Sequence, residues 1–228
     1  MHKSLQTRND RGFSLLELLI AMAITILLMG LASSVLMESF NIRHREDQVS
    51  DALADSQRAI NIMSREIANA GFNLSTNGIV PGDSGRTSIR IRSNLNKYDP
   101  AAGLESQKEV RDPGEDIKYF VNAAENTNYL VRYDEFSTAK SKATVLANRL
   151  DSLRIYYFAQ QVSYSTSGCD IKDPSSAEVA PEAARYIVLA VCVQLAEVGT
   201  ANSPGHRRQM NVLLASDVTL RNADLRSY

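Results

Sequence analysis

A single uninterrupted apolar stretch dominates the N-terminal part of the chain. From Phe13 to Leu36 most residues are Leu, Ile, Met, Ala or Val, the others are Phe13, Gly30 and a few hydroxyl residues, and the only ionisable one is Glu17. As an α-helix this stretch would extend about 36 Å, which exceeds the roughly 30 Å hydrocarbon thickness of a bilayer. Because backbone groups in lipid must be paired internally, the pattern predicts a transmembrane helix over residues 13–36.

The helical pattern continues beyond the apolar stretch. Residues 37–70 contain no proline or glycine. Apolar residues recur there at helical spacing, at Val49, Leu53, Ile60, Met63 and Ile67. This spacing predicts an amphipathic helix whose apolar stripe packs against a domain core. Gly71 is expected to end the helix, so that the amphipathic half covers residues 37–71.

After Gly71 the pattern changes to short segments of alternating polarity, separated by polar stretches rich in Gly and Pro. These segments predict strands at 88–93, 117–121, 129–133, 150–159, 186–195, 210–214 and 218–220. The most apolar segment, 186–195, is expected to be a central strand, and 163–184 a long loop. A long helix followed by closely connected strands predicts an α+β domain with a mostly antiparallel sheet over residues 72–228.

Length and charge limit the class of protein. The chain has 228 residues, enough for one domain beside a membrane span, and its 25 basic and 26 acidic residues argue against a dedicated nucleic-acid binder. Before the apolar stretch, Lys3, Arg8 and Arg11 outweigh Asp10. This basic flank predicts a cytoplasmic N-terminus and translocation of the remainder.

The junction between the basic leader and the apolar stretch carries a motif. The leader, residues 1–12, ends in Gly12, the apolar stretch starts at Phe13, and Glu17 follows at the fifth position after the glycine. A charge in a membrane helix is costly and is therefore a functional candidate. The motif resembles the cleavage and methylation site of type IV prepilins and type II secretion pseudopilins. That resemblance implies cleavage by prepilin peptidase after Gly12, N-methylation of Phe13, and a contact of Glu17 with the N-terminal amine of a neighbouring subunit.

Three further segments, 65–72, 145–158 and 218–222, resemble the minor pilins called PilW and also GspJ-like minor pseudopilins. The resemblance implies the type IV pilin fold, with a long N-terminal helix packed on the sheet. It also implies a structural protein, not an enzyme, that primes type IV pilus assembly and uses no cofactor or metal. The chain would be held in the inner membrane with a periplasmic C-terminal domain, and minor pilins of this kind can sit at the pilus tip. The implied partners are other minor pilins, the major pilin, prepilin peptidase and the inner-membrane assembly platform.

Other interpretations of the anchor remain open. A Sec signal peptide cut near Ala32 or Ser34 would fit the small residues there, and a plain signal anchor would fit the length. Against both, the acidic Glu17 lies within the apolar stretch. A GspJ-like pseudopilin shares every feature of the motif. A membrane-anchored periplasmic hydrolase or binding domain is the alternative from another class.

Few residues outside the motif suggest chemistry. In a periplasmic domain Cys169 and Cys192 are expected to form a single disulfide. The string GDSG at residues 82–85 resembles the serine motif of trypsin-like proteases, but no upstream histidine lies in a matching context. Two loop carboxylates, Asp170 and Asp173, would suit calcium, although solvated loop acids are the commoner explanation.

Basic side chains gather near the first and last predicted strands. They are Arg86, Arg90, Arg92, Lys97, Arg207 and Arg208. Such a patch would suit DNA contact in an uptake pilin. Alternating arginines are more often the solvated face of a strand, and the sequence favours that interpretation.

Overall fold

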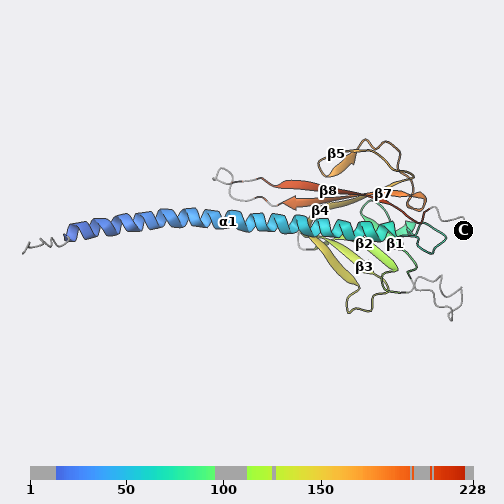
Figure 1. Ribbon diagram of the computed structural model, residues 1–228, viewed down its shortest axis with the longest axis horizontal. Helices are drawn as coiled ribbons and strands as arrows, with labels where there is room; N and C mark the ends of the chain where they lie inside the picture. The colour runs from blue at the N-terminus through green and yellow to red at the C-terminus, as the bar shows by residue number, and fades with distance from the viewer. Residues whose placement is uncertain are drawn as a thin grey trace, which may run out of the picture. The chain divides into compact units, whose positions relative to one another are not determined.

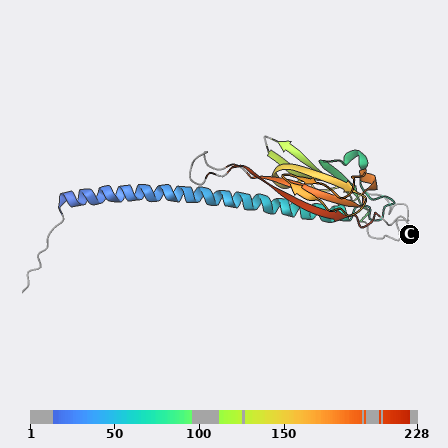
Figure 2. The ribbon, with the colours of Figure 1, turned by 90° about the horizontal axis from the view of Figure 1, so that it is seen from above.

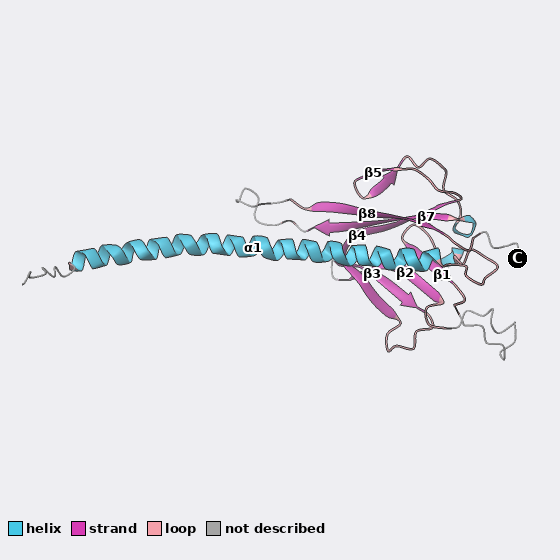
Figure 3. Cartoon of the chain, viewed as in Figure 1, coloured by secondary structure: helices cyan, strands magenta, loops and turns pink. Residues whose placement is uncertain are grey.

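A long helix and a six-stranded antiparallel sheet make up the computed structural model of the chain (Figures 1 and 3). The structure describes residues 14–95, 112–124, 127–195, 197, 206 and 208–223. The helix, α1, runs over Leu15–Ala68. The chain divides into two compact units, Met1–Asp47 and Gln48–Tyr228, and the boundary falls within α1.

The sheet has the strand order β1-β2-β3-β4-β7-β8. Its strands are β1 (Ser88–Arg92), β2 (Asp116–Ala124), β3 (Thr127–Asp134), β4 (Ala143–Phe158), β7 (Tyr186–Leu195) and β8 (Met210–Thr219). Every neighbouring pair is antiparallel, with register shifts at β3–β4 and β4–β7. The predicted α+β class, a long N-terminal helix packed on an antiparallel sheet, is therefore confirmed.

The C-terminal part of α1 lies along one face of the sheet and packs with it to form the main core (Figure 2). The predicted apolar stripe is the side that is buried, with Ile60, Met63 and Ile67 almost fully covered. The structure adds small residues to the stripe, namely Ala52, Ser56 and Ala59. Small side chains let the helix backbone approach the sheet, and hydropathy periodicity alone does not single them out.

Odd-numbered residues of β7, and of β4 from Leu153 onward, face α1, whereas the even-numbered residues there face the opposite side. The second face carries a smaller core built around Phe158, Val162, Ile171 and Val188. A short hairpin, residues 165–172, contributes Ile171 to this core; it consists of β5 (Ser165–Ser167) and β6 (Asp170–Lys172) and is called the flap below. β7 is therefore covered on both faces, which explains its continuous apolar sequence.

Glycine is required at the turn that follows α1. Gly71 and Gly78 have φ of 78° and 76°, in the left-handed region that favours glycine. The Gly71 amide donates to the Arg92 carbonyl over 2.9 Å, and Gly78 accepts from the Arg92 amide over 2.7 Å. A Cβ on Gly78 would lie 2.1 Å from the Gly71 nitrogen. α1 ends at Ala68, three residues before the predicted stop at Gly71. Of the two glycines, Gly78 is the tighter position.

A buried carboxylate, that of Glu115, binds the backbone on both sides of residues 96–111. Glu115 is 1% exposed. One of its oxygens accepts from the Leu95 amide over 2.6 Å and the other from the Asp112 amide over 2.9 Å. This arrangement, called the Glu115 clamp below, holds Leu95 and Asp112 next to the start of β2.

Some predicted strand boundaries were wrong. β4 begins at Ala143, before the predicted strand, and β8 is one continuous strand where two were expected. The predicted loop 163–184 contains the flap and a 3-10 turn, η2 (Pro181–Ala183); a matching turn, η1 (Pro81–Asp83), lies before β1. β7 is flanked by β4 and β8 and lies next to the edge, not in the middle of the sheet.

Candidate functional site

The predicted assembly residue Glu17 lies in the first turn of α1 and is exposed. One of its carboxylate oxygens accepts a hydrogen bond from the Ser14 amide over 3.1 Å, while the Ser14 hydroxyl accepts one from the Leu16 amide over 3.3 Å. This reciprocal pattern is a capping box, which satisfies amides that a helix start leaves unpaired. The predicted cleavage and methylation residues, Gly12 and Phe13, lie outside the described residues.

The capping box gives Glu17 a role that the sequence analysis missed. The signal was present as Ser14-x-x-Glu17, the capping-box spacing, directly before an apolar stretch. The negative carboxylate also lies at the positive end of the helix macrodipole. Among the described residues, the other Glu17 oxygen makes no hydrogen bond, so the side chain can accept a second donor without leaving its cap.

The surface of the N-terminal part of α1, on both sides of Glu17, is apolar. Large side chains are exposed along this part of the helix, at Leu15, Leu16, Leu18, Leu19, Ile20, Met22, Ile24, Ile26, Leu27, Leu28, Met29, Leu31, Val35, Leu36, Met37 and Phe40. Among the described residues, α1 is the one helix long and apolar enough to cross a membrane, and its most apolar window is 0% buried. Exposed apolar surface of this extent is typical of a membrane-anchored protein.

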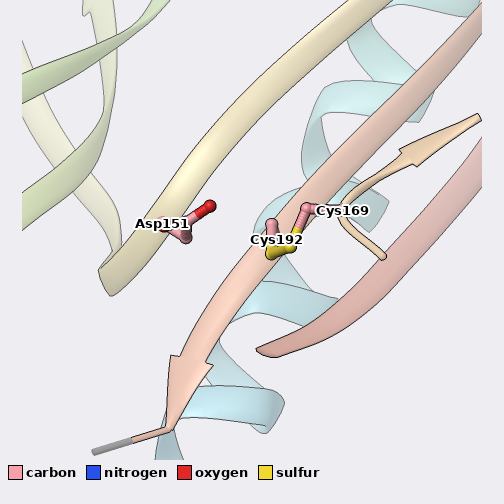
Figure 4. A group of neighbouring side chains, drawn as sticks. All are labelled: Asp151, Cys169 and Cys192. Atoms are coloured by element: carbon pink, nitrogen blue, oxygen red, sulfur yellow. A yellow bond between two sulfur atoms is a disulfide. The ribbon is translucent and has the colours of Figure 1, made fainter. Parts of the chain in front are cut away.

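The two cysteines join the flap to the sheet (Figure 4). The sulfurs of Cys169 and Cys192 are bonded, and their Cα atoms lie 5.4 Å apart, within the range found for disulfides. The Asp151 carboxylate lies beside them, and the three side chains together have the spacing of a metal-binding group. Bonded sulfurs are not the thiolates that bind soft metals, so this group is a disulfide next to a carboxylate.

A polar network holds the flap on the face of the sheet opposite α1. Asp170 accepts a hydrogen bond from the Tyr156 hydroxyl and another from Arg154 over 3.1 Å. The Arg86 guanidinium lies 4.6 Å from the Tyr156 ring centre and pairs with Glu178 over 2.9 Å. Both oxygens of the Asp170 carboxylate, which the sequence suggested as a calcium ligand, therefore already accept hydrogen bonds from the Tyr156 hydroxyl and the Arg154 guanidinium.

The basic residues of β1 are neutralised by acids. Asp116, which is buried, pairs with Arg90 over 2.6 Å and with Arg92 over 2.8 Å. Asp83 of the GDSG string pairs with Lys118 and Arg90, and these two hydrogen bonds lower its pKa to about 2. A nucleic-acid interface needs unpaired cations, so these pairs disfavour DNA binding by this strand. Lys97 and Arg207 lie outside the described residues.

The Ser84 hydroxyl is bound to the backbone of β1. It accepts from the Arg90 amide over 3.0 Å and donates to the Arg90 carbonyl over 3.3 Å. A serine nucleophile instead needs a hydrogen bond to a general base. The GDSG string therefore makes a turn that closes the edge of β1.

A polar contact fixes the C-terminal part of α1 on the sheet. Glu66 accepts two bonds of 3.1 Å from the Arg132 guanidinium, one to each carboxylate oxygen. The Tyr119 hydroxyl also donates to Glu66, and burial, followed by the charge of Glu66, raises the pKa of Tyr119. A bidentate, partly buried pair of this kind fixes orientation as well as distance.

Comparison with known families found one match. Residues 7–33 match the family described as the prokaryotic N-terminal methylation motif. The comparisons with curated proteins and with solved structures found no match. The matched residues include Gly12, Phe13 and Glu17. The motif therefore supports a membrane-anchored, type IV pilin-like or pseudopilin protein with a structural role.

Proposed function

We propose that the chain is a PilW-like minor pilin that takes part in priming and assembling a type IV pilus after processing by prepilin peptidase. The observation that carries this proposal is the N-terminal methylation motif at residues 7–33. It is supported by the exposed apolar surface of α1 and by the packing of the same helix on an antiparallel sheet.

The proposal assigns a role to each part of the chain. Residues 1–12 are the leader, 13–36 the half of the helix in the inner membrane, 37–71 the periplasmic half and 72–228 the globular domain. Processing leaves a methylated amine on Phe13, and Glu17 accepts the amine of a neighbouring subunit while its other oxygen caps its own helix. The partners are other minor pilins, the major pilin, the peptidase and the assembly platform.

Mass spectrometry of the mature protein tests the processing step. We expect an N-terminus at Phe13 carrying one methyl group. Gly12→Val should block the cut, because a branched side chain replaces the smallest residue at the scissile bond, whereas the conservative Leu15→Ile should be processed normally. A mature N-terminus near Val35 would instead establish a Sec signal peptide. A leader that persists beside an active peptidase would favour an anchored hydrolase or binding domain.

A minor pseudopilin of a type II secretion system is the second candidate, because the methylation motif is common to both assemblies. Deleting the gene separates them. Loss of pili with normal secretion supports the minor pilin, and loss of secretion with normal pili supports the pseudopilin. Restoring each phenotype with the wild-type gene is the control for polar effects of the deletion.

A further inference from the structure

The two edge strands of the sheet, β1 and β8, differ in how far their outward-facing backbone groups are hydrogen-bonded. At β1 the outward backbone groups of Arg90 and Arg92 are paired with residues that precede the strand: Arg92 bonds to both Gly71 and Gly78, and the Arg90 carbonyl accepts from Val80 over 2.9 Å. The Ser84 hydroxyl accepts from the Arg90 amide, and the Gly85 amide donates to the Ser88 carbonyl. This edge is closed to any further strand.

At β8, two backbone hydrogen bonds just after the strand show which residues point their backbone N–H and C=O groups towards β7 and which point them away from the sheet. The Leu220 amide donates over 2.9 Å to Arg185, just before β7, whereas the Arg221 amide donates over 3.1 Å to Ala68 at the end of α1. β7 and β8 pair over ten positions without a register shift. Backbone groups alternate between the two sides of a strand, so the odd-numbered residues of β8 point away from the sheet.

The outward residues are Asn211, Leu213, Ala215, Asp217 and Thr219. In the part of the chain that the structure describes, no hydrogen bond reaches their outward backbone groups. Within β8 the one ionisable side chain is Asp217, which accepts from the Tyr164 hydroxyl over 2.7 Å, and the strand contains no Lys, Arg or Pro. Proteins usually protect a free edge with such residues or with a covering segment.

The apolar character of the strand adds to its open backbone. Met210 is 60% exposed, and Val212 and Leu214 are half-buried on the face that carries α1. Leu213 packs at the border of the core under the flap. An added strand would therefore gain main-chain hydrogen bonds together with apolar neighbours on both faces.

We propose that the outward edge of β8 binds an extended strand of a different pilin-like subunit, by β-strand addition. This inference rests on the proposed function. The strand that fits is uncharged, with alternating apolar side chains. A second copy of this chain fits poorly, because residues 48–68 of α1 run in the same direction as β8, with Ser64 beside Ser216 and Ala68 beside Arg221. Antiparallel pairing of two β8 edges would therefore put residue 48 of the two chains at opposite ends of the pair, although both chains continue from that residue into an apolar stretch that has to enter the same membrane.

Photo-cross-linking of the full-length chain in its own host tests this edge. A photo-reactive residue replaces the exposed Asn211, and the cross-linked peptides are identified by mass spectrometry. We expect a bond to a strand of another chain that carries the N-terminal methylation motif. A cross-link of the chain to itself, or no cross-link, overturns the proposal.

Substitutions at Ala215 show whether the outward backbone groups of β8 bind the partner strand. Ala215→Pro removes an outward amide but no bond to β7, so the sheet should persist while the cross-linked fraction falls at least tenfold. Ala215→Ser keeps the amide and should cross-link like the wild type. Ala215→Lys adds a charge to the edge and should also reduce the cross-link. An intact Cys169–Cys192 bond verifies folding of each variant, and unchanged cross-linking in both Ala215→Pro and Ala215→Lys overturns the proposal.

Two failures are distinguishable here. If the mature N-terminus is not at Phe13, the proposed function fails. If processing at Phe13 is normal and the cross-link is absent, the assignment of β8 fails while the minor-pilin proposal stands.

Discussion

Ser56 places a hydroxyl inside the main core. The residue is fully buried, and none of the described groups bonds to its oxygen. A buried hydroxyl without a partner costs roughly 1–3 kcal/mol. On the same helix, the Ser64 hydroxyl pairs with Ser216 over 2.9 Å. The two serines therefore allow a direct comparison, on one helix, of a hydroxyl without a hydrogen-bond partner and a hydroxyl with one.

Ser56→Ala should raise the free energy of unfolding by about 1 kcal/mol, since it removes an unpaired polar group and adds helix propensity. Ser64→Ala gains the same propensity but loses a hydrogen bond, so it should be neutral or destabilising. Denaturant titrations of both variants measure the difference. Equal effects at the two sites would show that the Ser56 hydroxyl has a partner.

Gly78→Ala is the most damaging small substitution that the fold predicts. Its Cβ would lie 2.1 Å from the Gly71 nitrogen and 2.3 Å from the Arg92 oxygen, and both neighbours are backbone. Because of these two close contacts and the positive φ, we expect Gly78→Ala to lower the free energy of unfolding by at least about 3 kcal/mol. Gly82→Ala, where nothing lies within 4 Å, is the control and should be close to neutral. Thermal unfolding of the two variants checks both statements.

Among the elements, the flap is held by one covalent bond and one polar network. The disulfide closes a sequence separation of 23 residues, a loop size for which the chain-entropy treatment gives about 3 kcal/mol. The Asp170 contacts add a second attachment. Loss of the disulfide should therefore loosen the flap without unfolding the sheet.

Replacing both cysteines, Cys169→Ala with Cys192→Ala, should lower the free energy of unfolding by roughly 2–4 kcal/mol. Hydrogen exchange should rise in residues 165–172 and stay unchanged in β1 and β2. Wild-type protein treated with reductant should match the double variant. Two titratable thiols in protein taken from the periplasm would contradict the predicted disulfide.

The η1 turn should respond to acid. Hydrogen bonds from Lys118 and Arg90 hold the folded pKa of Asp83 at about 2, against a usual value of 3.8. A depressed pKa contributes stability that is complete above the usual value and is lost as the pH falls towards 2. Unfolding curves of wild type and Asp83→Asn should therefore differ at pH 5 and converge near pH 2. Asp151→Asn, which removes an exposed carboxylate without an ion pair among the described residues, should show no such convergence.

The elements that sequence patterns predicted best were those in which one periodicity extended over many residues. The helix stripe at Ile60, Met63 and Ile67 and the apolar β7 are of this kind. The flap was missed because three-residue strands carry too little alternation to stand out from a polar loop. The early start of β4 was missed because its first residues are exposed, where polarity does not report strand structure.

The candidate site is compact in sequence. Gly12, Phe13 and Glu17 lie within six consecutive residues, so a local motif can point to them, and their roles stay a prediction. The pairing of β1 arginines with Asp116 and Asp83 was not predictable, since it joins residues far apart in the chain. Long-range pairing depends on strand register, which a single sequence does not specify.

For the whole molecule, the proposed role of Glu17 joins its observed cap at the helix start to a contact with a neighbouring subunit. Glu17→Ala should leave membrane insertion and cleavage intact, because it makes the helix more apolar, but should weaken association with other pilins and reduce the number of pili. Glu17→Gln keeps a capping acceptor and loses the charge. If the charge is the assembly contact, both variants should assemble poorly, and if only the cap matters, Glu17→Gln should assemble normally. Co-purification of the complex and pilus counts measure both, and wild-type levels in Glu17→Ala would contradict an assembly role.

The Glu115 clamp makes one place in the domain tolerant of new sequence. Because a single side chain holds both Leu95 and Asp112, the sheet is indifferent to how many residues connect them. The free energy of closing a longer connection rises only slowly with its length. An epitope or fluorescent tag placed between these two residues would travel with the subunit through processing and export. It would mark where the subunit sits in an assembly while the helix, the flap and the β8 edge remain as they are.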